Sequence, residues 1–362
     1  MTSFYALIMA GGTGTRLWPV SRRDRPKQSL RLVGNRTMFE HAVDRIAPVF
    51  QPEQILVVAG SEHVRGLADQ APELPAENFI AEPVGRGTAP AIGLGALHLY
   101  RRDQDAIMAV LTADHFISDQ EQFRSVLSAA EEIAEAGYLV TLGIEPSAPS
   151  TGYGYIHQRD LLDQVDGFDV FHVQRFTEKP SRETALHMVE SGEYTWNSGM
   201  FIWRVDRILE EFEAQMPDFH VQLAELDAAL GTRGYKPTLE RIWPQVTKQA
   251  IDYGVMEGAK DVAVIPVGIG WSDVGSWASL AELLADIVDQ DKGGNVVVGQ
   301  HTGLDTTESL IFGGERLIAT IGLDRMIVVD AGDALLVCPR DREQDVRDLV
   351  RRLEKEELDE YL

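Results

Sequence analysis

Cysteine is almost absent from this sequence of 362 residues, which contains only Cys338. A single cysteine cannot form a disulfide within the chain, and no Cys/His cluster accompanies it to bind zinc, so we expect Cys338 to be a core residue. Long apolar runs are also missing: none approaches the ~18 residues of a membrane span, and the N-terminus lacks the pattern of a secretory signal. These absences predict a cytoplasmic protein that makes no contact with a membrane.

Positive charge is scarce as well, because 33 Lys and Arg stand against 57 Asp and Glu and leave a net charge of −24. A surface of this sign repels nucleic acid and anionic membranes, so neither is expected as a partner. A small anionic ligand would need a local cluster of positive charge. One segment supplies it, with Asp24 as its only acid among the basic residues Arg16, Arg22, Arg23, Arg25, Lys27 and Arg31.

A glycine turn precedes this basic segment. The apolar run 6–9 is typical of a short buried strand, and it is followed by Gly11, Gly12, Thr13, Gly14 and Thr15. Glycine lacks Cβ, so such a turn can take left-handed dihedrals and bring backbone N–H groups close to an anion. With Arg16 and Lys27 nearby, the turn predicts a site that fits a triphosphate.

The spacing of the glycines excludes two common nucleotide-binding motifs. A dinucleotide fingerprint that begins at Gly12 would need glycine where Leu17 stands, and a P-loop would need Gly-Lys-Ser/Thr in place of residues 14–16. An ordinary tight turn beside a solvated basic loop is the alternative for the glycines alone. The coupled Arg and Lys residues favour the phosphate site.

Through the first half, apolar strand-like runs alternate with helical patterns, which predicts an α/β fold with a mostly parallel sheet covered on both faces. Ligands then bind at the carboxyl ends of the strands. The predicted strands are 6–9, 54–59, 78–81, 106–111 and 139–144, and the predicted helices are 37–47, 89–101 and 120–136.

The second half of the chain shows a different pattern of predicted strands and helices. We expect strands near 153–158, 170–178 and 199–205, and helices near 205–230 and 275–288. Short apolar runs after Gly293-Gly294-Asn295 predict a small β unit. The last segment is expected to be an amphipathic helix with Val346, Leu349, Val350 and Leu353 on one face, and docking of this face on its own domain is favoured over a dimer seam. The predicted domains are a catalytic domain over 1–290, the β unit over 291–340 and the C-terminal helix over 341–362.

Two aspartates are candidates for a metal site. Asp114 follows a predicted strand, and Asp273 lies in a turn that also holds two tryptophans and two serines. Hard oxygen ligands of this kind suit Mg²⁺. Each aspartate alone has a purely structural alternative, such as capping the next helix.

Further polar groups follow in the second half. Gly152 and Tyr153 offer backbone donors and aromatic surface, Glu178 and Lys179 put a carboxylate beside an ammonium, and Asn197 precedes a strand. Such a set can hold a sugar hydroxyl and a phosphate. A surface ion pair and a turn asparagine are the alternatives for these residues one by one.

Taken in order, these motifs resemble those of the mannose-1-phosphate guanylyltransferases over residues 4 to about 290. The chain beyond is similar to the single-function members of that family, which lack an isomerase domain. The segments that carry the resemblance are 11–19, 26–28, 82–83, 88–90, 113–115, 151–155, 176–180, 196–201 and 271–277.

The resemblance implies a Rossmann-like nucleotide-sugar transferase fold with a mixed sheet, and a C-terminal β unit that is β-helix-like. It also implies transfer of GMP from GTP to mannose 1-phosphate, with Mg²⁺ as cofactor, to give GDP-mannose and pyrophosphate. It places the triphosphate at Gly11, Gly12, Thr13, Gly14, Thr15, Arg16 and Lys27, the base near Glu82, Thr88, Ala89 and Pro90, the metal at Asp114 and Asp273, and the sugar phosphate at Gly152, Tyr153, Glu178, Lys179 and Asn197. Arg16, Lys27, Lys179, Asp114 and Asp273 would be the catalytic residues.

One residue departs from the family pattern: Gly87 stands where Asn is expected before Thr-Ala-Pro. Two alternatives therefore stay open. One is a sugar-1-phosphate nucleotidyltransferase with another base or hexose, and the other is a non-catalytic homologue that senses nucleotide sugars. The resemblance also suggests that the β unit near 295–340 forms a homodimer contact.

Overall fold

The computed structural model describes residues 3–12 and 14–362. They form two compact units, and each is described by itself. The first holds the N-terminal residues up to Gly11 together with Ala42–Ala113 and Ile117–Trp271. The second holds Gly12–His41, Asp114–Phe116 and Ser272–Leu362. The domain bounds expected from the sequence remain a prediction.

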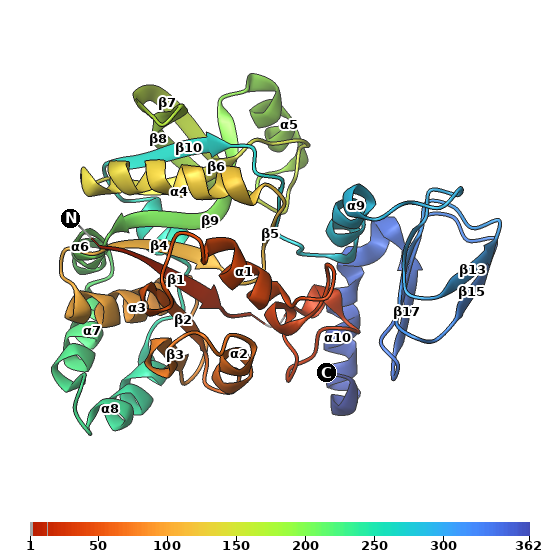
Figure 1. The fold of residues 1–362 in the computed structure, drawn as a ribbon, viewed down its shortest axis with the longest axis horizontal. Coiled ribbons are helices and arrows are strands. Elements are labelled where there is room, and N and C mark those ends of the chain that lie inside the picture. The colour runs from red at the N-terminus through yellow and green to blue at the C-terminus, as the bar shows by residue number, and fades with distance from the viewer. Residues whose placement is uncertain (1–2, 13) are drawn as a thin grey trace. The chain divides into compact units, whose positions relative to one another are not determined.

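A single twisted sheet organises the first unit (Figure 1), and its strands run in the order β3-β2-β1-β4-β9-β6-β10-β8-β7. Strands β3, β2, β1 and β4 are mutually parallel, whereas β9 is antiparallel to both β4 and β6. The sheet is therefore mixed, as expected. Its strands are β1 (Phe4–Ala10), β2 (Ile55–Gly60), β3 (Phe79–Glu82), β4 (Ile107–Thr112), β6 (Leu139–Ile144), β7 (Gly154–Val165), β8 (Phe168–Glu178), β9 (Tyr194–Arg204) and β10 (Val262–Val267).

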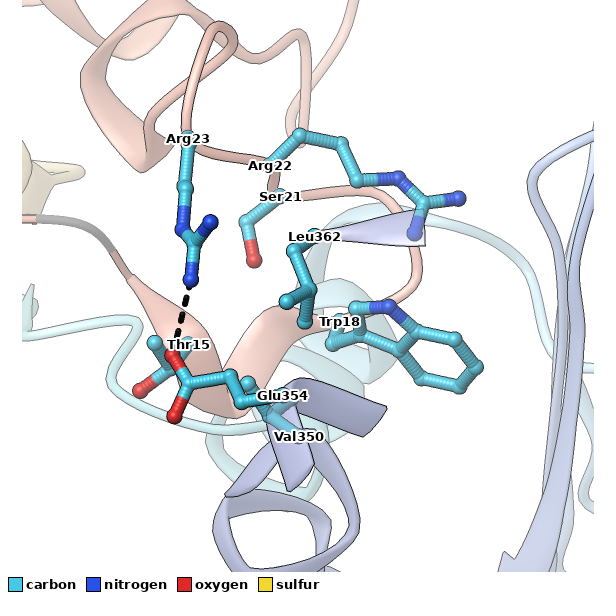
Figure 2. A pocket seen from close by; sticks show the side chains of 8 residues that line it. All are labelled: Thr15, Trp18, Ser21, Arg22, Arg23, Val350, Glu354 and Leu362. Carbon is cyan, nitrogen blue, oxygen red and sulfur yellow. Dashed lines mark hydrogen bonds and ion pairs between the residues drawn. The ribbon is translucent and has the colours of Figure 1, made fainter. Parts of the chain in front are cut away.

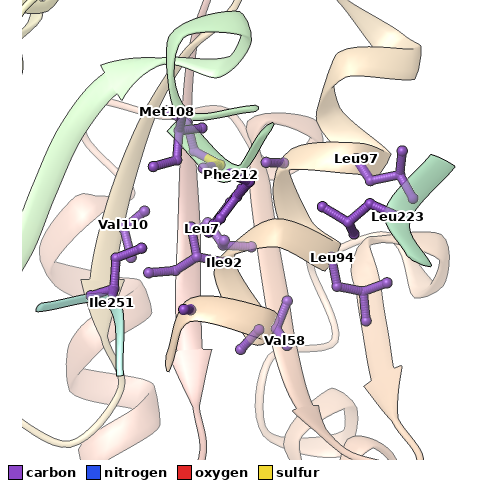
Figure 3. Packing of buried hydrophobic residues seen from close by; sticks show 14 of the residues in the cluster. Leu7, Val58, Ile92, Leu94, Leu97, Met108, Val110, Phe212, Leu223 and Ile251 are labelled. Atoms are coloured by element: carbon purple, nitrogen blue, oxygen red, sulfur yellow. The ribbon is translucent and has the colours of Figure 1, made fainter. Parts of the chain in front are cut away.

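Helices bury both faces of this sheet. On one face, Leu7, Val58 and Val110 pack with residues of α3, α6 and α7 (Figure 3), while α4 packs along β6, β9 and β10. The alternate residues Ile8 and Val57 are also fully buried, which is why the central strands are continuously apolar. The helices of this unit are α2 (Val64–Gln70), α3 (Thr88–Arg102), α4 (Gln120–Glu135), α5 (Arg182–Ser191), α6 (Val205–Gln215), α7 (Pro217–Ala229) and α8 (Tyr235–Ile242).

The sequence predicted one helix over 205–230, but the structure has two helices there, α6 and α7. Pro217 is the first residue of α7, and Met216 before it has φ −130° and ψ 58°, outside the helical region. Proline has no N–H to donate to the preceding turn and pushes the residue before it away from helical dihedrals. The chain therefore breaks at this point and starts a new helix.

The second unit begins at Gly12 and is completed by the C-terminal quarter of the chain. Two ladders of short parallel strands, β12–β14–β16 and β13–β15, form a β-helix-like stack, which agrees with the expected β unit. Cys338 lies in β17 and is partly rather than fully buried. The strands are β12 (Val296–Val298), β13 (His301–Leu304), β14 (Leu310–Phe312), β15 (Ile318–Ile321), β16 (Met326–Asp330) and β17 (Leu335–Pro339).

Two helices complete the core of the second unit: α9 (Trp277–Ile287) and α10 (Val346–Lys355). The side chain of Ser276 caps α9 by accepting a bond from the N–H of Ser279. Val346 and Val350 of α10 are buried, whereas Leu349, which was expected on the same face, is 37% exposed. Helix α1 (Met38–Ile46) and the short strands β5 (Phe116–Ile117) and β11 (Trp271–Ser272) lie where the chain passes between the units.

Within the described ranges, no helix is long and apolar enough to cross a membrane.

Candidate functional site

The glycine turn opens the second unit. Gly14 has φ 63° and ψ 28°, the left-handed conformation, and it leads into a short 3₁₀ turn over Thr15–Leu17. A Cβ on Gly14 would lie 2.7 Å from Cβ of Lys27, so glycine is needed here for its dihedrals and for the close approach of Lys27. The hydroxyl of Ser21 donates to the carbonyl of Gly14 at 2.8 Å and holds the turn in place.

A cavity of about 360 Å³ in the second unit brings six of the predicted residues together. Gly12 is exposed and does not line it, and Thr13 lies outside the described residues. The lining residues are Gly14, Thr15, Arg16, Leu17, Lys27, Asp114, His115, Asp273, Gly275 and Arg347.

Lys27 connects the two aspartates of this cavity. Lys27 is only 5% exposed, and its Nζ donates to Oδ2 of Asp114 at 2.9 Å and to the backbone carbonyl of Asp273. Burial raises the pKa of Asp114, but the Lys27 ammonium and His115 outweigh it and hold that pKa below its ordinary value. Asp114 is therefore a carboxylate at neutral pH.

The loop after Ser272 holds Asp273 in a bent conformation. Oδ1 of Asp273 accepts from the N–H of Gly275 at 3.0 Å, and Val274 between them has φ 44° although its side chain is β-branched and fully buried. A β-branched residue at positive φ is strained, and such strain is concentrated at functional sites.

Among the basic residues of the cluster, the structure separates two roles. Arg16 and Lys27 line the cavity, whereas Arg22 pairs with Asp333 at 2.8 Å and Arg23 pairs with Glu354 at 3.1 Å. The basic segment is therefore only partly a ligand site, because its middle ties the loop to the C-terminal part of the unit.

The residues expected at the sugar phosphate lie in the first unit, at adjacent strand ends. Gly154 pairs with Glu178 across β7 and β8, and a Cβ on Gly154 would lie 2.5 Å from Oε2 of Glu178. Lys179 follows with φ 46°, a left-handed conformation that is uncommon for lysine, and its Nζ bonds to the Glu178 carboxylate.

Tyr153 lies between two tryptophans. Its ring centroid is 4.9 Å from that of Trp196 and 5.4 Å from that of Trp271, both in edge-to-face geometry. The preceding residue, Gly152, donates its N–H to the hydroxyl of Ser150 at 3.2 Å. Aromatic packing thus fixes the loop whose backbone was expected to receive the sugar.

Asn197 is oriented by a residue that the sequence analysis did not select. Its Nδ2 donates to Oδ1 of Asp252 at 2.6 Å, and its Oδ1 accepts from the N–H of Gly199 at 3.0 Å. Burial, and to a lesser degree the charge of Glu178, raise the pKa of Asp252, although the bond from Asn197 opposes this. Asp252 starts a π-helical turn, an arrangement frequent at functional sites.

The residues expected near the base also lie in the first unit. Glu82 is 6% exposed at the end of β3, and Ala89 and Pro90 are buried in the first turn of α3. Burial raises the pKa of Glu82 to about 7, even though the N–H of Arg86 and the side chain of Trp243 favour the ionised form.

One segment of the first unit contacts both the residues expected near the base and Asn197, which is expected at the sugar phosphate. The carbonyl of Gln249 accepts from the N–H of Ala89 at 3.1 Å, and the N–H of Ile251 donates to the hydroxyl of Thr88 at 2.8 Å. Asp252, the next residue, bonds to Asn197. Residues 249–252 therefore link the first turn of α3 to Asn197.

Asp252 and Arg347 are the residues that sequence reasoning missed. Asp252 carried a weak signal, as an acid within the apolar run 250–256. The C-terminal helix carries many charged residues of both signs, and nothing in the spacing of Arg347 distinguishes it from the others. Only the packing of α10 brings it to the cavity.

The fold is that of a nucleotidyl transferase. The family model described as Nucleotidyl transferase matches residues 5–290, and the one described as MannoseP isomerase/GMP-like beta-helix domain matches residues 299–353. A crystal structure from Thermus thermophilus, described as a mannose-1-phosphate geranyltransferase, superimposes with a TM-score of 0.86 at 36% identity, over 98% of this chain and 100% of that one.

Curated relatives show to which family of nucleotidyl transferases the chain belongs. A Klebsiella pneumoniae mannose-1-phosphate guanylyltransferase is 40% identical over 358 residues, which are 98% of this chain and 75% of the relative. A Salmonella typhimurium mannose-1-phosphate guanylyltransferase is 41% identical over 370 residues, 99% of this chain and 75% of the relative. The chain belongs to the mannose-1-phosphate guanylyltransferase family.

Proposed function

We propose that this protein transfers GMP from GTP to mannose 1-phosphate. A phosphate oxygen of the sugar phosphate forms a bond to the α-phosphorus of GTP while the bond to the β-phosphate bridging oxygen breaks, which gives GDP-mannose and pyrophosphate. The observation that carries the proposal is the cavity in which the Gly14 turn, Arg16, Lys27 and two carboxylates meet, in a chain of this family.

The phosphate-binding residues of the second unit would position and neutralise the triphosphate. Arg16 and Lys27 are the basic groups of the turn that line the cavity, and Gly14 keeps the backbone close to Lys27. The nucleophile is already anionic, so no general base is required, and positioning with charge stabilisation supplies the catalysis. The first unit would bind the sugar phosphate through Gly152, Tyr153, Glu178, Lys179 and Asn197, and would meet the base at Glu82 and Thr88–Pro90.

We also propose that Asp114 and Asp273 hold Mg²⁺. Magnesium binds through one or two carboxylates and completes its shell with phosphate oxygens and water. The donor set fits this pattern: two carboxylates line one cavity, and no cluster of three His, Cys, Asp or Glu for a free-standing metal site occurs in 3–12 and 14–362. When bound, the ion would offset phosphate charge and polarise the P–O bonds.

A homodimer contact through the β unit is a further part of the proposal. Leu304 of β13 and Ile321 of β15 are paired in register, and they are 65% and 76% exposed. Leu317, which precedes β15, is also exposed. Neighbouring exposed apolar side chains of this kind support an interface at this face.

The decisive experiment measures pyrophosphate release with Mg²⁺, using GTP and mannose 1-phosphate beside glucose 1-phosphate and the other nucleoside triphosphates. We expect turnover with GTP and mannose 1-phosphate, and its loss in excess EDTA. Turnover with a different pair would keep the fold and reaction but change the substrate. No turnover with any pair would favour the nucleotide-sugar sensor.

A further inference from the structure

Helix α10 brings one arginine into the phosphate cavity. Arg347 lines the same space as Arg16, Lys27, Asp114 and Asp273, although it lies more than 300 residues after the glycine turn. The helix packs directly on the 3₁₀ turn that carries Arg16. Its presence in the cavity therefore follows from tertiary packing within the second unit.

The neighbours of Arg347 on the helix are engaged elsewhere. Arg351 pairs with Asp348 at 2.8 Å and Arg352 pairs with Glu356 at 2.7 Å, along the surface of the helix itself. The guanidinium of Arg347 makes no ion pair or hydrogen bond with any residue in the described part of the chain. Other exposed arginines, such as Arg65 and Arg182, also make no ion pair among the described residues, but Arg347 differs from them because it lines the cavity.

The position of α10 is held by contacts with the basic loop. Val350 and Glu354 of the helix line a small pocket together with Thr15 and Trp18, and Figure 2 shows the Arg23–Glu354 ion pair, which is 3.1 Å long. Beyond the helix, the carbonyl of Tyr361 accepts bonds from Trp18 Nε1 at 2.7 Å and from Arg22. The loop and the C-terminal segment thus hold each other, which keeps Arg347 beside the turn.

Two guanidinium groups that line the cavity, those of Arg16 and Arg347, are available to bind an anion. The Lys27 ammonium is already paired with Asp114, whereas Arg16, like Arg347, makes no ion pair among the residues that the structure describes. Arginine presents a planar set of donors that matches phosphate oxygens. Two unpaired guanidinium groups that line one cavity are suited to a polyphosphate, which carries several charges over a short length.

We infer that Arg347 is a further phosphate-binding residue, supplied by the C-terminal helix, that binds the diphosphate portion of the nucleotide and the departing pyrophosphate together with Arg16. The identity of the nucleotide in this inference rests on the proposed function. The binding of pyrophosphate by Arg347 does not depend on it. It gives the C-terminal helix a direct role in the site.

The test titrates the full-length protein with inorganic pyrophosphate by calorimetry, once with Mg²⁺ and once with EDTA. Removing one charged donor should weaken binding by about 10- to 100-fold in Arg347→Ala, and Arg347→Lys should recover part of it. Arg351→Ala is the matched control, since it removes an exposed arginine of the same helix that does not line the cavity, and it should bind as the wild type does. In turnover, Arg347→Ala should raise the KM for GTP and leave that for mannose 1-phosphate unchanged.

The outcomes separate this inference from the proposed function. Pyrophosphate binding that is equal in wild type and Arg347→Ala under both conditions, or equally weakened in Arg351→Ala, would overturn the role of Arg347. Binding that depends on Arg347 in a protein without turnover on GTP and mannose 1-phosphate would support Arg347 and refute the proposed function. Unfolding curves of the variants check that the helix remains docked.

Discussion

Gly87 has φ 88° and ψ 178°, a backbone conformation that is essentially restricted to glycine. A Cβ at this position would lie 2.4 Å from the carbonyl oxygen of Gln249, which is backbone and cannot easily move away. The family resemblance expects Asn here. In this chain the neighbouring segment approaches so closely that glycine is required, so the departure has a structural cause.

Replacing Gly87 by alanine should therefore destabilise the fold by about 2–3 kcal/mol, from backbone strain and the contact with Gln249. Urea unfolding measures the loss. Gly85→Ala is the control, because nothing lies within 4 Å of its Cβ position and its φ is not positive, and it should change stability by less than about 0.5 kcal/mol. Equal effects of the two substitutions would show that the strain at Gly87 is absent.

Glu82 is a second residue whose surroundings decide its chemistry. Its pKa is raised from 4.5 to about 7 by burial, with Glu62 adding to the shift. The folded state thus holds a proton that the unfolded state releases, so this group lowers stability as the pH rises from about 4.5 to about 7.

Glu82→Gln removes this titration, and the variant should gain stability over the wild type by up to about 3 kcal/mol at pH 8, at ~1.4 kcal/mol per pKa unit. At pH 5 the difference should fall below about 1 kcal/mol, since Glu82 is then protonated in the folded protein and only partly ionised in the unfolded state. Urea unfolding of both proteins at pH 5, 6, 7 and 8 measures the difference. A difference that does not change with pH would refute the raised pKa.

At the scale of elements, residues 249–252 link two parts of the candidate site in the first unit, since they contact Thr88, Ala89 and Asn197. The contacts with α3 use backbone atoms, and the contact with Asn197 uses the side chain of Asp252. A substitution at 252 therefore disturbs the contact with Asn197 and leaves the backbone contacts in place.

Asp252→Ala leaves Nδ2 of Asn197 without its acceptor, and the amide is then free to turn. We expect the KM for mannose 1-phosphate to rise about tenfold, from the loss of one hydrogen bond to a charged group, while the KM for GTP stays near the wild-type value. Asp252→Asn keeps an acceptor oxygen and should show the smaller effect. Initial rates with each substrate varied in turn provide the test, and a rise in both KM values would indicate a merely structural role.

Much of the element pattern was predictable from the sequence. The strand 139–144 was placed at its observed bounds, and 106–111 was one residue away, because fully buried strands are short continuous apolar runs. The hairpin β7–β8 was underestimated: its strands meet at Asp166 and Gly167, both with positive φ, so an Asp-Gly turn signal was present and was not used. Helices α2, α5 and α8 were missed, since packing rather than a local pattern stabilises them. Strand β10 was missed although Val262–Val267 is a short apolar run, which Pro266 interrupts.

For the whole molecule, the exposed apolar strip of β13 and β15 leads to a prediction about assembly. If this strip is a dimer contact, sedimentation should give a mass near twice the 40.1 kDa of the chain, and Ile321→Asp should shift it toward one chain by placing a charge in the contact. Leu161→Asp is the control, because Leu161 is 56% exposed on β7 of the other unit. A wild-type protein that sediments as a single chain at micromolar concentration would exclude the dimer.

The sequence by itself determined the class of the protein and predicted a phosphate site at its glycine turn, because glycine spacing and charge act locally and can be read in one dimension. It identified Lys27, Asp114 and Asp273, which one cavity then brought together. Only the tertiary structure decided that Arg22 and Arg23 pair with the C-terminal part of the second unit. It likewise decided that Asp252 orients Asn197 and that Arg347 lines the cavity, since these contacts join residues that are 55 or more positions apart and have no local pattern.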